Sequence, residues 1–167
     1  ERGNVTLLGF AVNQNGVARA TTSVNLNGSV YLLARDKATV QEVTTGVGKP
    51  VPTRTGTLTL GENSLTEVAP DDLAQTAVDA QAQAVSRIEL AGKEITLQAG
   101  ARVVAPGGNV NVVATQIPRL EENPGLTKDI PPNDSKVVMQ SGSLIDVSGL
   151  ASALLPMERN IIAVVLR

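Results

Sequence analysis

The segment closest to a known chemical motif is residues 44–50, TTGVGKP, which contain a Gly-x-Gly-Lys sequence. A phosphate-binding loop of the Walker type requires G-x-x-x-x-G-K-[ST] between a strand and a helix, because its glycine backbone cradles the phosphates that the lysine also reaches. Here Val43 occupies the position of the first glycine, and Pro50 follows Lys49. The segment is therefore predicted to be a surface turn.

Acidic residues that could act in hydrolysis or hold Ca²⁺ occur in three places. Asp71 and Asp72 are adjacent and precede an Ala- and Gln-rich stretch, where acidic residues more often cap a helix and complement its dipole. Glu121 and Glu122 lie in a Pro-rich segment and are expected to be solvated. Asp146, in LIDVSG, alternates outward in a strand and is expected to be exposed or to anchor a turn. The sequence predicts no catalytic residue, no cofactor and no metal ligand set.

The composition excludes much of the remaining chemistry. The chain has 167 residues with no cysteine and no histidine, which rules out thiolate catalysis and removes the commonest general base. The net charge of −2 and the two aromatic residues, Phe10 and Tyr31, do not suit nucleic-acid binding. No run of about 18 apolar residues indicates a membrane span.

Three N-x-[ST] sequons, at Asn4, Asn27 and Asn133, are interpreted as chance matches in a chain rich in Asn, Ser and Thr.

Short runs that alternate apolar and other residues recur along the chain, as in TLTL and NVNV, and Gly- or Asn-containing corners separate them. Val, Ile and Thr suit a pleated surface, so the runs are predicted to be strands. The predicted strands cover residues 4–8, 18–24, 29–34, 57–60, 87–90, 94–98, 102–104, 109–114, 136–140, 143–147 and 160–166.

The spacing of the predicted strands indicates a repeat. Val5 and Val30 stand 25 residues apart in GNVTLLG and GSVYLLA, within the roughly 20–45 residues over which a solenoid coil repeats. A β-sandwich would also give many short strands. The shortness of the strands, the scarcity of aromatic residues and the single corners favour a solenoid.

In a solenoid of this kind the inner residues form columns of like side chains. The residues predicted to face inward are Val5, Leu7, Val30, Leu32, Leu58, Leu60, Ile95, Leu97, Val110, Val112, Leu144 and Val147.

Three stretches interrupt the strand pattern and are predicted to be excursions from the coils. They are residues 37–56, 70–86 and 117–135; the second could hold one short helix near 71–85. Surface loops more often carry binding than the coils that support them.

Three phrases resemble the body of filamentous-haemagglutinin-type exoproteins of bacterial two-partner secretion systems. They are residues 18–36 (ARATTSVNLNGSVYLLARD), 86–115 (SRIELAGKEITLQAGARVVAPGGNVNVVAT) and 141–167 (SGSLIDVSGLASALLPMERNIIAVVLR). The most specific part is I-D-V-S-G-L followed by L-P-M-E-x-N and a V-x-L-R strand. The resemblance implies a right-handed parallel β-helix, with residues 1–167 as one internal segment of a longer rod, because nothing in the chain resembles the family's N-terminal secretion domain.

The resemblance implies a non-enzymatic structural or adhesive role outside a Gram-negative cell or on its surface. The implied partners are an outer-membrane secretion barrel during export, a host or bacterial glycan or protein receptor, and other copies through the coil ends. The stalk of a contact-dependent toxin is an alternative. A β-helical polysaccharide-degrading enzyme is a weaker one, since the chain has few aromatic residues and no carboxylate cluster beyond Asp71 and Asp72.

Overall fold

The computed structural model describes residues 3–22, 28–35, 37–44, 47–53, 55–70, 85–116 and 134–149. Every regular element in these ranges is a strand, so the described part of the chain is all-β. The strands are β1 (Asn4–Gly9), β2 (Ala11–Gln14), β3 (Val17–Thr22), β4 (Ser29–Ala34), β5 (Lys37–Thr44), β6 (Val47–Thr53), β7 (Thr57–Leu60), β8 (Leu65–Pro70), β9 (Arg87–Gly92), β10 (Glu94–Leu97), β11 (Arg102–Val104), β12 (Asn109–Ala114), β13 (Lys136–Met139) and β14 (Leu144–Asp146).

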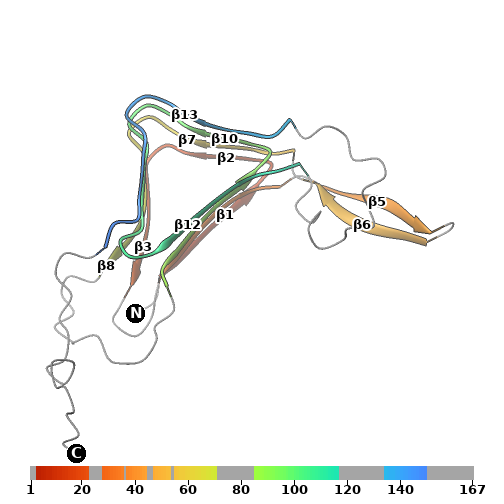
Figure 1. The fold of residues 1–167 in the computed structure, drawn as a ribbon, viewed down its shortest axis with the longest axis horizontal. Coiled ribbons are helices and arrows are strands. Elements are labelled where there is room, and N and C mark those ends of the chain that lie inside the picture. Colours follow the sequence, from red (N-terminus) through yellow and green to blue (C-terminus); the bar gives the residue numbers. More distant parts are fainter. Residues whose placement is uncertain are drawn as a thin grey trace, which may run out of the picture.

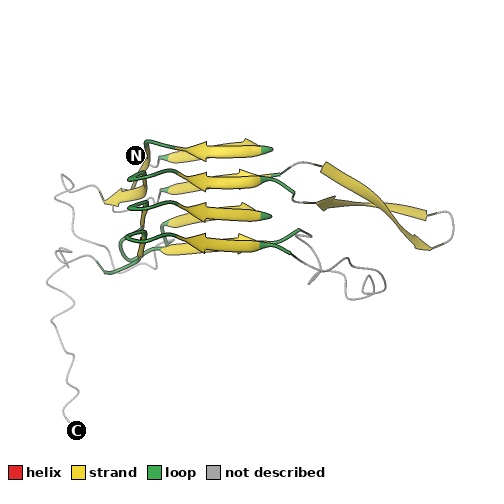
Figure 2. Cartoon of the chain, turned by 90° about the horizontal axis from the view of Figure 1, so that it is seen from above, coloured by secondary structure: helices red, strands yellow, loops and turns green. Residues whose placement is uncertain are grey.

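Twelve of these strands form three four-stranded sheets in which every pairing is parallel. Sheet A has the order β1-β4-β9-β12, sheet B β13-β10-β7-β2 and sheet C β14-β11-β8-β3. The chain visits A, B and C in turn and then starts again beside its previous pass. Each pass is one coil: coil 1 is β1–β3, coil 2 is β4, β7 and β8, coil 3 is β9–β11, and coil 4 is β12–β14. The result is a three-sided, solenoid-like stack (Figures 1 and 2), which confirms the predicted all-β class and stacking of strands.

The strands stay in register although the coils differ in length. In sheet A the aligned residues Asn4, Ser29, Arg87 and Asn109 are 25, 58 and 22 residues apart along the chain. The longest coil contains the β5–β6 hairpin, which extends to one side of the stack (Figure 2). The additional residues of the longer coils therefore lie between strands, and the parallel pairing of the strands is not disturbed.

The core consists of apolar columns that run along the stack. In sheet A, Val30 lies beside Ile88, and Leu32 lies beside Leu90; all four are fully buried. The branched side chains fit the pleat, and each is covered by the equivalent residue of the next coil. The core cluster and the residues packed on it include all the predicted inner residues except Leu7, Leu144 and Val147.

The prediction that Leu144 faces inward is wrong. Its side chain is 42% exposed, and the neighbouring Ile145 packs against the core in its place. Leu144 pairs with the exposed Arg102, and Ile145 pairs with the buried Val103. A shift of one residue exchanges the two faces of a strand, and in LIDV the sequence alone does not fix that phase. Val147, also predicted to face inward, is 47% exposed, but it lies two residues after Ile145, beyond the end of β14 in the outer coil, so the same shift does not account for it.

The corner between sheets B and C has a recurrent left-handed residue. Asn63, Gly100 and Gly142 have φ of 55°, 71° and 74° at equivalent places in coils 2, 3 and 4. The corners also bond from coil to coil: Gln98 Oε1 accepts a hydrogen bond from the Glu62 N–H at 3.1 Å, and Gln140 Oε1 accepts one from the Ala99 N–H at 3.2 Å. Asn and Gly provide the positive φ that a tight corner needs, as the sequence indicated.

The predicted excursion at residues 37–56 contains strands that the sequence did not indicate. β5 and β6 pair antiparallel, with Pro50 opposite Val40 and Pro52 opposite Ala38. Proline occurs in sheets where its missing N–H faces away from the partner strand, so the outer edge of β6 lacks a donor at both positions. This edge is a poor template for a further strand.

Two coil strands were also missed, β2 and β8. The possible helix near 71–85, the predicted strand at 160–166, and most of the excursions at 70–86 and 117–135 lie outside the described residues.

Candidate functional site

The outer side of sheet A carries polar side chains that lie in register from coil to coil. Ser29 Oγ donates a hydrogen bond to Asn4 Oδ1 at 2.6 Å, between coils 1 and 2. Tyr31 is half-buried between Thr6 of coil 1 and Glu89 of coil 3. These polar groups lie beside an apolar column on the same side of the sheet, in which Leu8, Leu33 and Ala91 are register partners.

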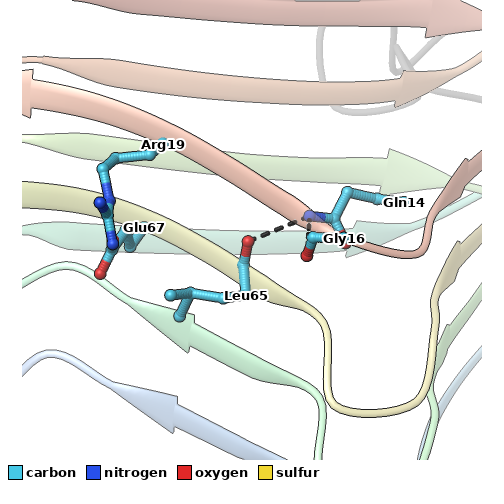
Figure 3. Close-up of polar contacts among 5 residues, drawn as sticks. All are labelled: Gln14, Gly16, Arg19, Leu65 and Glu67. Carbon is cyan, nitrogen blue, oxygen red and sulfur yellow. Dashed lines mark hydrogen bonds and ion pairs between the residues drawn. The ribbon is translucent and has the colours of Figure 1, made fainter.

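Charged side chains on the outer surface pair mainly between coils. Arg19 of β3 bonds to Glu67 of β8, its register partner in the next coil (Figure 3). Lys136 Nζ lies 3.4 Å from Glu94 Oε1, again between register partners. The paired charges hold neighbouring coils together and do not build a patch of one sign.

Lys93 and Asp134 form a further ion pair, with Nζ and Oδ2 3.1 Å apart. The hydrogen bond from Lys93, helped by the charges of Lys93 and Lys136, lowers the pKa of Asp134. Lys93 is the single corner residue between β9 and β10, and Asp134 lies just before β13. The pair therefore ties coil 4 back to coil 3 where the chain returns from the 117–133 segment.

The phosphate-loop candidate at 44–50 lies on the hairpin. Thr44 ends β5, and residues 47–50 begin β6, which returns antiparallel. A Walker loop needs a helix after the glycines, so the strand-to-strand return excludes it. The predicted surface turn over 44–50 is wrong for Thr44 and for residues 47–50, which are strand, and residues 45–46 lie outside the described residues.

Asp146 anchors a turn, as predicted. Its Oδ1 accepts a hydrogen bond from the Ser148 N–H at 2.9 Å, directly after β14. Hydrogen bonds from the side chain and the backbone of Ser148, together with the charge of Arg102, lower the pKa of Asp146. The carboxylate is therefore held by its own turn.

The other sequence candidates fall outside the described residues: Asp71, Asp72, Glu121, Glu122 and the sequons at Asn27 and Asn133. The sequon residue Asn4 is exposed, and its amide oxygen is the acceptor for Ser29. Within the described ranges, no three His, Cys, Asp or Glu residues come close enough to hold a metal ion. The same ranges contain no helix with the length and hydropathy to cross a membrane.

The sequence missed a group of polar side chains inside the stack. Gln14, Ser64 and Thr66 are 5%, 2% and 0% exposed, at the corner between sheets B and C in coils 1 and 2. The Gln14 amide donates from Nε2 to the carbonyl oxygens of Gly16 (2.9 Å) and Leu65 (3.0 Å), as Figure 3 shows. Gln14 occupies a position that is Leu60 in coil 2, and this break in the apolar column becomes visible only when the coils are aligned in the structure.

Comparison of the chain with protein-family models, with curated proteins and with solved structures gives no match. The fold itself gives the class: the described residues form an all-β, solenoid-like structure with three parallel sheets.

Proposed function

We propose that the chain is a structural and adhesive segment of a secreted or surface-exposed bacterial exoprotein of the filamentous-haemagglutinin type, wound as a right-handed parallel β-helix. The observation that supports this proposal is the constant register of coils whose aligned residues are 25, 58 and 22 residues apart. A stack of this kind gains about 4.8 Å of length per coil and tolerates insertions at its corners. It is suited to spanning a distance and presenting projecting segments.

The β5–β6 hairpin is the described element that best fits a presenting role. It leaves coil 2 between β4 and β7 and extends away from the stack (Figures 1 and 2). Its prolines on β6 disfavour strand-to-strand association along that edge, which suits an element that must stay exposed. The proposed partners are a surface glycan or protein receptor of a host or bacterial cell, an outer-membrane barrel during export, and other copies through the coil ends.

The role is proposed to be non-enzymatic. The described carboxylates that the sequence singled out or that form ion pairs are engaged in a turn or with basic side chains of the same or a neighbouring coil. A polysaccharide-depolymerisation assay tests this part of the proposal. Turnover by the intact chain would contradict it.

The adhesive role can be tested by removing the hairpin without disturbing the stack. In coil 1 and in coil 3 a single residue, Phe10 or Lys93, joins sheet A to sheet B. Deleting residues 35–55 leaves Gly56 as the equivalent single residue in coil 2, and Gly56 already accepts the Lys93 N–H at 2.9 Å. The shortened chain is expected to keep the β-rich circular dichroism spectrum of the parent.

The binding readout is attachment of the purified chain to bacterial and epithelial cell surfaces and to an array of surface glycans. The parent chain is expected to bind, and the deletion variant is expected to lose most of that binding. If neither chain binds any surface while both are folded, the adhesive proposal fails and a stalk role is favoured. If both bind equally, adhesion stands but the hairpin is not its site.

A further inference from the structure

Three buried oxygen atoms in the corner between sheets B and C have no hydrogen-bond partner. They are Gln14 Oε1, Ser64 Oγ and Thr66 Oγ1. Each belongs to a side chain that is at least nine-tenths buried, and most buried polar atoms in proteins do have a partner. Three such atoms in one corner indicate a shared binding site.

The contacts of Gln14 place its amide beside the residues that carry the two hydroxyls. Its Nε2 donates to the Leu65 carbonyl at 3.0 Å, and Leu65 stands between Ser64 and Thr66 in the chain. Leu65 is only half-buried, whereas the side chains on either side of it are buried. The amide of coil 1 and the two hydroxyls of coil 2 therefore belong to the same buried corner.

The polar character of this corner in coils 1 and 2 does not continue into coil 3. Ala101 and Val103, the residues of coil 3 equivalent to Ser64 and Thr66, are fully buried and apolar. Ile145 of coil 4 packs against the same apolar column. A hydrogen-bonding group held here would contact oxygens from coils 1 and 2 and apolar side chains from coil 3.

The corner of coil 1 is also the shortest. Ala11 and Val17 begin its two strands six residues apart, whereas the equivalent strands begin eight residues apart at Thr57 and Leu65 in coil 2. Coils 3 and 4 repeat the spacing of eight. Gln14 Nε2 bonds to the carbonyls of both corners, at Gly16 and Leu65, and so bridges two corners of unequal length.

We propose that the Gln14–Ser64–Thr66 corner binds one ordered water molecule. A water donates two hydrogen bonds and accepts others, so it can donate to the amide oxygen and to one hydroxyl while it accepts from the second hydroxyl. Buried waters typically make about three hydrogen bonds, which equals the number of oxygens here. The three side chains include no carboxylate, so the site offers no charge to favour a cation over a neutral water.

The first test needs only the unmodified chain. A crystal structure at atomic resolution is expected to show one water within hydrogen-bond distance of all three oxygens. Density refined as an ion, with contacts near the roughly 2.4 Å typical of hard cations, would overturn the assignment to water. An empty corner would overturn the proposal as a whole.

Magnetic relaxation dispersion of the solvent counts long-lived internal waters in solution and does not depend on crystals. The double substitution Ser64→Ala, Thr66→Val copies the apolar residues of coil 3 and is expected to remove one long-lived water from the count. Thr96→Val, the same change at a half-buried outer position of β10, is the matched control and is expected to leave the count unchanged. Equal counts for the folded double variant and the parent would contradict the proposal.

Discussion

The middle and the outer coils of the described stack have the same architecture and differ in how well their inner residues are covered. Leu32 of coil 2 and Leu7 of coil 1 are register partners in one column. Leu32 is fully buried between two coils, whereas Leu7 has a described neighbour on one side only and is 40% exposed. In this fold the burial of a side chain therefore depends on its level in the stack as well as on its residue type.

The largest expected effect compares these two leucines. Leu32→Ala is expected to lower the free energy of unfolding by about 2–5 kcal/mol, because it removes fully buried methyl groups and leaves a cavity between coils 1 and 3. Leu7→Ala, the matched change, is expected to lower it by no more than about half as much, since the side chain already meets solvent. Urea denaturation followed by circular dichroism measures both. Equal losses would show that Leu7 is covered as fully as Leu32.

The second comparison uses the glycine column of the B–C corner. A Cβ at Gly100 of coil 3 would clash with Asn63 Oδ1, whereas at Gly142 of coil 4 its nearest heavy atom would be the Gly100 N at 3.7 Å. Both positions have positive φ, so Gly→Ala adds strain of about 1–2 kcal/mol at either. Gly100→Ala is expected to lower the free energy of unfolding by about 1 kcal/mol or more in addition to this backbone strain, because the Asn63 side chain must move.

The same denaturation experiment measures the two glycine variants side by side. The double variant Asn63→Gly, Gly100→Ala is the control, since removing the Asn63 side chain removes the obstruction. The double variant is expected to lose less free energy of unfolding than Gly100→Ala, and its loss should approach that of Gly142→Ala. A Gly142→Ala variant as unstable as Gly100→Ala would show that backbone strain alone decides both positions.

Much of the coil architecture could be predicted from the sequence because most strands carry an unbroken alternation. TLTL at β7 and EITL at β10 place one apolar residue in every second position, and the structure buries those residues. The alternation fails at β2 (AVNQ) and β8 (LTEVAP), where Gln14 and Thr66 occupy inner positions. The sequence missed both strands for this reason.

The polar corner could not be predicted because its members are far apart in the chain. Gln14 meets Leu65 across 51 residues, and the length of coil 2, which includes the hairpin, decides that register. No local pattern encodes a contact that depends on where an excursion ends. The two coil strands that were not predicted, β2 and β8, are thus the strands that carry the buried Gln14 and Thr66.

The smallest expected effect concerns Asp146 at the end of coil 4. Its pKa is lowered by hydrogen bonds from Ser148 and by the charge of Arg102. A carboxyl group whose pKa is lower in the folded state stabilises the fold at pH values above its unfolded pKa, near 3.9. That contribution is lost as the pH falls through the folded pKa. Protonation of Asp146 is therefore expected to lower the free energy of unfolding slightly as the pH falls below about 4.

Asp146→Asn isolates this contribution, because the amide oxygen can still accept the Ser148 N–H but does not titrate. The variant is expected to keep the turn and to show a weaker loss of stability between about pH 4 and pH 2 than the parent chain. Titration of the carboxyl carbon by NMR measures the pKa directly and is expected to give a midpoint below that of an unfolded peptide. A titration midpoint of Asp146 at or above the value of an unfolded peptide would mean that this turn in the outer coil is open in solution. The outer coils would then differ from the middle coils in backbone structure as well as in side-chain burial.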